Sequence, residues 1–157
     1  MIALLASIEV LAGDAYAAVH TSWSAGRFGD VPPALVQCIE TLAGHHQAAL
    51  LAWNRTLEGA GRPPVAAAPV EAAASVNLQL GSVVDAAGVG RALFSLERLI
   101  AATYLQQLVT FAGDESVTLA GSILSVDRQH MAVLLFAIGK YPAPDTFASP
   151  DFAYTPR

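Results

Sequence analysis

"SLERLIAATY" (Ser95–Tyr104) and "SIEVLAGDAY" (Ser7–Tyr16) follow one pattern: a glutamate stands two residues after a serine, and a tyrosine stands seven residues after that glutamate. The glutamates, Glu97 and Glu9, interrupt runs of apolar residues. A carboxylate that is buried among apolar side chains is costly unless another group pairs with it. The repeat therefore predicts that the fold holds partners for two buried carboxylates.

Four segments of the chain, which include both stretches, have the apolar spacing of helices. They cover about residues 2–25, 30–58, 89–112 and 114–138. In the first segment, the apolar positions that share one helix face are Leu5, Ile8, Ala12, Tyr16 and Val19. Turns that contain glycine or proline separate the first segment from the second, and Gly113 ends the third.

The lengths of the connections predict how these helices are arranged. The connections within each pair of helices are short, which favours antiparallel hairpins, whereas the segment at about residues 61–87 is long enough to cross the bundle from end to end. We therefore expect an all-α fold, in which a four-helix bundle over residues 1–139 consists of two helical hairpins joined by this crossover. The tail, residues 140–157, is rich in proline and aromatic residues and is expected to pack on the bundle as irregular structure.

The repeat extends into the second helix of each predicted hairpin. Aligning "IETLAGHHQAALLAW" from Ile39 with "ILSVDRQHMAVLLFA" from Ile123 pairs His46 with His130, and it also pairs two consecutive leucines with two others. The chain is therefore interpreted as a duplicated helical hairpin, and each copy supplies one glutamate and one histidine.

These residues form a candidate metal site. Glu9 and Glu97 lie on the apolar stripes of their helices, His46 and His130 lie among apolar residues, and Asp127 shares a helix face with His130 because it lies three residues before it. Carboxylates and imidazoles that converge inside a bundle suit one or two divalent metals. The alternative is that each glutamate is hydrogen-bonded to a tyrosine or a histidine across the bundle, without an ion.

Several motifs resemble a known family. They are "SLERLIAATY", "HHQAALLAWN" followed by "GAGRPP", and "SILSVDRQHMAVLL" followed by "PAPDTFASP". The chain resembles the ferritin-like superfamily, and in particular bacterial ferritin-like domain proteins, which often carry export signals. Di-iron members of that superfamily use a Glu from each of two helices and a Glu-x-x-His pair from each of the other two.

The resemblance implies ligands on four helices. They are Glu9, His46, Glu97, Asp127 and His130. The second-helix pair is incomplete because Ala43, three residues before the histidine, has no donor atom, and Asp127 is one methylene shorter than the usual Glu. His45 points about 100° away from His46 around the helix, so it is not expected to replace the missing donor.

The expected function is that of a ferritin-like metal-binding protein with a partly degenerate di-metal site. The cofactor would be one or two ions of iron or manganese, or none, and the activity would be that of an oxidase or of metal handling. The alternative is a non-catalytic, metal-free ferritin-like module that acts in protein interaction or stress protection. No G-x-S-x-G turn is present to anchor a hydrolase triad.

Composition limits the partners and the compartment. Hydrophobic residues make up 54% of the chain and charged residues 13%, which predicts an apolar surface and a homo-oligomer, in particular a dimer. The net charge is −5 and the eight basic residues are scattered, so nucleic acid is not expected. The apolar run at residues 131–138 is far shorter than the roughly 20 residues of a membrane span, and we expect none. The sequence does not decide the compartment: the protein is expected to be cytoplasmic, or exported if the chain is a trimmed mature form.

Overall fold

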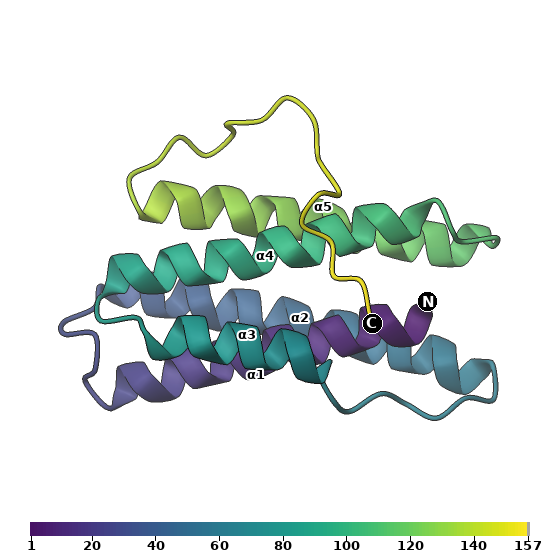
Figure 1. Ribbon diagram of the computed structural model, residues 1–157, viewed down its shortest axis with the longest axis horizontal. Coiled ribbons are helices and arrows are strands. Elements are labelled where there is room, and N and C mark those ends of the chain that lie inside the picture. Colours follow the sequence, from purple (N-terminus) through teal and green to yellow (C-terminus); the bar gives the residue numbers. More distant parts are fainter. Residues whose placement is uncertain (157) are drawn as a thin grey trace.

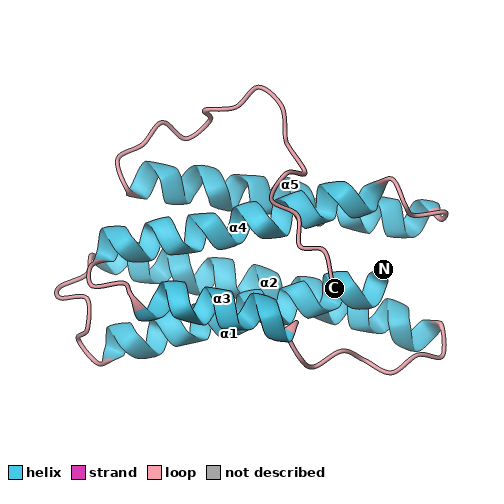
Figure 2. Ribbon diagram, in the orientation of Figure 1, coloured by secondary structure: helices cyan, strands magenta, loops and turns pink. Residues whose placement is uncertain are grey.

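Five helices form between residues 1 and 156, the part of the chain that the computed structural model describes, apart from the side chain of Asp114. They are α1 (Ile2–Ser24), α2 (Pro33–Gly59), α3 (Val70–Gly81), α4 (Ala86–Leu108) and α5 (Asp114–Ala137). The described residues contain no strand, as Figure 2 shows. The predicted all-α fold is confirmed.

Two helical hairpins lie side by side in the bundle (Figure 1). Helix α1 packs along α2, and α4 packs along α5. The hairpins meet mainly where α1 contacts α4, whereas α2 and α5 touch each other very little. The expected apolar face of α1 is buried, and it forms the core together with residues of α2, α4 and α5.

Glycine and proline residues set several helix ends. Pro33 occupies the first turn of α2, where its missing N–H group is not needed. Gly26, with φ of 73°, lies in the turn after α1, and Gly139, with φ of 72°, follows the last turn of α5. The N–H of Gly139 donates to the carbonyl of Phe136, and the N–H of Lys140 donates to that of Leu135. These bonds satisfy carbonyls that the helix itself leaves free.

The crossover contains a helix, α3, that the sequence pattern did not predict. Asn54 fixes the start of the crossover, because its side chain donates to the carbonyl of Val65 at 2.9 Å and accepts from the N–H of Val65 at 2.8 Å. Helix α3 then packs against α1 and α4 and buries Ala72 and Val76. Helix α4 begins at Ala86, three residues earlier than expected, because the carboxylate of Asp85 caps it.

The C-terminal tail has no helix or strand in its described part, residues 140–156. It arches away from α5 and returns across α4 towards the N-terminus (Figure 1). Its last part contacts the bundle: the N–H of Tyr154 donates to the hydroxyl of Thr103 at 2.9 Å, and the guanidinium of Arg98 lies 3.7 Å from the ring centroid of Phe152. Phe147, by contrast, is exposed.

Helix α1 is long and apolar enough, by length and composition, to cross a membrane. Half of the apolar window that meets this test is buried inside the bundle, and a core helix or a signal sequence has the same properties. Glu9, a fully buried residue, lies in this helix. The expectation that the chain has no membrane span stays a prediction.

Candidate metal centre

A buried histidine joins the two glutamates of the repeat. Glu9 in α1 and Glu97 in α4 are 1% and 0% exposed, and His46 in α2 lies between them. The Nδ1 atom of His46 lies 2.8 Å from Oε2 of Glu9, and its Nε2 atom lies 2.9 Å from Oε1 of Glu97. One imidazole therefore links carboxylates from the two hairpins.

The tyrosines of the repeat exchange partners between the hairpins. The hydroxyl of Tyr16 in α1 donates to Glu97 at 2.6 Å, and the hydroxyl of Tyr104 in α4 donates to Glu9. Tyr104 also accepts the indole N–H of Trp53 at 2.6 Å. Burial, with Glu97 next to Tyr16 and Glu9 next to Tyr104, raises the pKa of both phenols well above the usual value. Both tyrosines therefore keep their protons and act as donors.

The second hairpin adds a histidine and an aspartate to the same cluster. The Nδ1 atom of His130 lies 3.3 Å from Oε2 of Glu97 and 4.0 Å from Oδ1 of Asp127. Asp127 is almost completely buried, and its Oδ2 atom has no hydrogen-bond partner among the described residues. Since a buried polar atom without a partner costs free energy, this oxygen calls for an explanation.

The charges in the cluster shift three pKa values. Burial alone would raise the pKa of Glu97, but His46, together with the hydrogen bonds from both histidines, lowers it to about 2. Burial alone would lower the pKa of His46, but Glu97 and Glu9 raise it well above the usual value. Burial, together with Glu9 and Glu97, raises the pKa of Asp127 well above its usual value. At neutral pH the ring of His46 is therefore protonated, and it donates to both glutamates.

The five predicted site residues lie in one buried cluster. Four of them, His46, Glu97, Asp127 and His130, offer ligand atoms that all lie within 4.8 Å of one another. The fifth, Glu9, contacts His46 and lies beside this group. Their convergence follows from the structure, and their role as metal ligands stays a prediction.

His45 contacts the cluster, although it was not expected to take part in the site. Its Nδ1 atom lies 2.9 Å from Nε2 of His130. Partial burial and the neighbouring His130 and His46 lower the pKa of His45, so its ring is neutral at neutral pH. The helical wheel gives its direction relative to His46, and only the position of α5 shows that this direction leads to His130.

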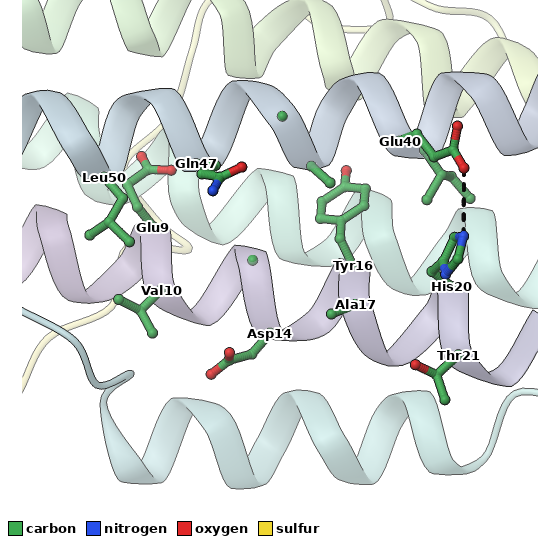
Figure 3. Close-up of a pocket in the computed structure, with 14 residues that line it drawn as sticks. Glu9, Val10, Asp14, Tyr16, Ala17, His20, Thr21, Glu40, Gln47 and Leu50 are labelled. Atoms are coloured by element: carbon green, nitrogen blue, oxygen red, sulfur yellow. Dashed lines mark ion pairs between the residues drawn. The ribbon is translucent and has the colours of Figure 1, made fainter.

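Two grooves, one on each side of α2, reach the cluster. The groove between α1 and α2 has a volume of about 580 Å³ and includes Glu9 and Tyr16 among its lining residues. Figure 3 shows this groove, with the ion pair of His20 and Glu40, 3.5 Å apart, at one end. The groove between α2 and α5 has a volume of about 320 Å³ and is lined by His45, His46 and Asp127 beside apolar residues. These apolar residues are Ala48, Ala49, Ala52, Leu119, Ile123 and Val126.

A family model of the ferritin-like domain matches residues 2–140 of the chain. The chain belongs to the ferritin-like domain family. No curated protein and no solved structure matches it. Within this ferritin-like domain, all four long helices supply side chains to the buried cluster. Helix α1 supplies Glu9, α2 supplies His46, α4 supplies Glu97, and α5 supplies Asp127 and His130.

The residues of the cluster fit a divalent metal ion. Carboxylate oxygens and imidazole nitrogens are ligands of first-row transition metals. The spacing of the four donors and the partnerless Oδ2 atom of Asp127 match what such an ion requires, because the ion would satisfy this oxygen. His46, Glu97, Asp127 and His130 are the residues that would hold it. Ala43 contributes no donor, so the cluster departs from a pattern with two complete ligand pairs.

Proposed function

We propose that this ferritin-like protein binds one divalent transition metal, iron or manganese, through His46, Glu97, Asp127 and His130. The observation that carries the proposal is the buried group of four donors within 4.8 Å, in which one oxygen of Asp127 has no hydrogen-bond partner in the part of the chain that the structure describes. The bound metal would supply redox chemistry with oxygen or peroxide. The activity that follows is that of an oxidase or of metal handling.

One ion is favoured over two because the donors are distributed unevenly. Glu97, Asp127 and His130 all belong to the second hairpin, and the first hairpin adds His46 to the group of four. Glu9 is engaged by His46 and by Tyr104, and Ala43 leaves α2 without a carboxylate.

The surrounding side chains prepare the donors. Tyr16 holds one oxygen of Glu97 at 2.6 Å, and such a hydrogen bond fixes the orientation of a ligating carboxylate. His46 must give up a proton before a ring nitrogen can bind a metal, because the metal-free cluster keeps this ring protonated. The affinity for metal is therefore expected to fall as the pH is lowered.

The test is elemental analysis of the protein after expression in medium supplemented with iron and manganese, together with thermal unfolding with and without each ion. About one ion per chain and a raised Tm are expected, because a ligand that binds only the folded state stabilises it. Fewer than about one ion per ten chains, together with an unchanged Tm, would overturn the proposal.

A matched pair of variants locates the site. Glu97→Gln removes a charge from the centre of the cluster, whereas Glu40→Gln removes a charge from an exposed residue that pairs with His20. The first variant is expected to lose the metal and the second to keep it. Equal metal content in the two variants would place the ion elsewhere.

A second candidate function rests on the same hydrogen bonds. Glu9 and Glu97 are already paired with Tyr104, Tyr16 and His46, so most of the cluster is satisfied without an ion. A metal-free ferritin-like module that acts in protein interaction or stress protection would need no more than this network. The metal content of the wild-type protein separates the two candidates.

We also propose that the protein forms a homo-oligomer, in particular a dimer. Large apolar side chains on the outer sides of α2 and α5, among them Leu51, Val133 and Phe136, are exposed and support this. Light scattering coupled to size-exclusion chromatography measures the molar mass. A monomer at all concentrations tested would contradict the proposal.

A further inference from the structure

A histidine pair crosses the seam between α2 and α5. His45 is exposed on α2, whereas His130 on α5 is 3% exposed. The planes of their rings are inclined by 12°, and Nδ1 of His45 lies 2.9 Å from Nε2 of His130. This separation is that of a hydrogen bond between the two rings. Because the backbones of α2 and α5 approach each other closely at few points, side chains such as these bridge the seam.

The two nitrogens of His130 face different surroundings. Nδ1 is directed to the cluster, where Glu97 lies at 3.3 Å and Asp127 at 4.0 Å. Nε2 is directed to the seam, and among the described residues its hydrogen-bond partner is His45. Nδ1 is therefore the nitrogen that is available to an ion in the cluster, and Nε2 is the nitrogen that a neighbouring residue can use to orient the ring.

We propose that His45 is a positioning residue of the metal centre, which accepts a hydrogen bond from Nε2–H of His130 and thereby holds Nδ1 towards the ion. The inference rests on the proposed function, since it assigns a role to His45 in that same site. A histidine that binds a metal through one nitrogen is oriented by the hydrogen bond of the other, and this bond fixes the tautomer.

The position of His45 explains why it can serve the second hairpin. Its neighbour His46 points into the core between the two glutamates, and His45, about 100° further around α2, contacts His130 of α5. In the aligned second hairpin the equivalent residue is Gln129. Helix α2, in which Ala43 offers no donor, therefore contributes twice to the site, directly through His46 and indirectly through His45.

The test uses three variants that differ in the hydrogen-bond acceptor at the seam. His45→Ala removes the acceptor, and His45→Asn replaces Nδ1 by a side-chain oxygen at a similar distance from the backbone. Ser122→Ala is the control, because Ser122 lines the same groove while its hydroxyl bonds the carbonyl of Leu119 in its own helix. Because residues 45 and 122 are exposed, all three variants are expected to fold, which thermal unfolding checks.

The readouts are the affinity for Co²⁺, measured by titration calorimetry, and the visible absorption spectrum of the Co²⁺ form. His45→Ala is expected to weaken binding roughly 10–100-fold and to alter the spectrum, because the ring of His130 is no longer held. His45→Asn is expected to recover most of the affinity, and Ser122→Ala to match the wild type. In the Zn²⁺ form, nitrogen-15 NMR of the histidine rings is expected to place the proton of His130 on Nε2.

The possible failures are distinguishable. If the wild type and Ser122→Ala bind no Co²⁺, the proposed function fails. If both bind it and His45→Ala binds it equally well with the same spectrum, the positioning role alone is overturned. If His45→Asn is as weak as His45→Ala, an acceptor at this position is not what matters, which also overturns the role.

Discussion

The two hairpins of the bundle share one pattern and use it together. In α1 and in α4, a tyrosine follows a buried glutamate by seven residues, yet neither tyrosine bonds the glutamate of its own helix. Tyr16 donates to Glu97, and Tyr104 donates to Glu9. The two tyrosines therefore link the hairpins to each other, whereas His46 and His130 also contact the glutamate of their own hairpin.

The histidines of the two hairpins differ. His46 bonds both glutamates, whereas His130 lies close to Glu97 and turns its other nitrogen to His45. The carboxylate donors follow the same asymmetry, because Asp127 in α5 has no counterpart in α2. The second hairpin therefore supplies most of the candidate metal centre. The first hairpin mainly supplies a network of hydrogen bonds.

Replacing Glu97, the carboxylate at the centre of the cluster, is expected to cause the largest loss of stability. Glu97→Leu leaves His46, His130 and Tyr16 without their shared carboxylate, and removing one member of a buried charged pair costs about 3–5 kcal/mol. Glu9→Leu affects two partners instead of three, so its cost is expected to be smaller. Urea unfolding in the presence of a chelator measures both. An equal or larger loss for Glu9→Leu would contradict the asymmetry between the hairpins.

The sequence predicted the four long helices because each has an apolar face, although α4 ends at Leu108, four residues before the expected end at residue 112. The start of α2 at Pro33 and the end of α5 before Gly139 follow from local geometry. Helix α3 could not be predicted in this way. Its segment is rich in alanine and valine, and a helix of this length depends on packing, here of Ala72 and Val76 against α1 and α4.

The sequence also predicted which glutamates and histidines would meet, because the repeat placed them at equivalent positions. It gave hydrogen bonds from a tyrosine or a histidine across the bundle as the alternative to an ion, and it did not say which tyrosine bonds which glutamate. The exchange of Tyr16 and Tyr104 between the hairpins depends on how the two hairpins are rotated against each other. The contact of His45 with His130 depends on where α5 lies, and no pattern within α2 contains that information.

Replacing either tyrosine is expected to cause a smaller loss of stability, and the order of the two losses shows which hydrogen bond between the hairpins is stronger. Tyr104→Phe leaves both the indole N–H of Trp53 and one oxygen of Glu9 without a partner, so a loss of about 2–3 kcal/mol is expected. Tyr16→Phe removes one of three partners of Glu97, and a loss of about 1 kcal/mol is expected. Thermal and urea unfolding of the two variants give the order. The reverse order would show that the bond to Tyr16 is the stronger link between the hairpins.

The smallest expected effect is a gain of stability rather than a loss. It concerns Asp127, a carboxylate that the first hairpin lacks. Burial, Glu9 and Glu97 raise the pKa of Asp127, so the folded, metal-free protein holds a proton there that the unfolded chain releases. The stability of the metal-free wild type therefore falls as the pH rises from the ordinary pKa of an aspartate towards the raised value.

Asp127→Asn removes this decline. At neutral pH the metal-free variant is expected to be more stable than the wild type by about 1 kcal/mol, although it loses a proposed metal ligand. Asp14→Asn, at an exposed position of α1, is the control and is expected to change neither stability nor metal content. Urea unfolding between about pH 4 and pH 8, with a chelator present, measures the difference. A metal-free Asp127→Asn variant that is less stable than the wild type across this range would mean that the aspartate is part of the supporting network, as Glu9 is, rather than a ligand kept at a cost.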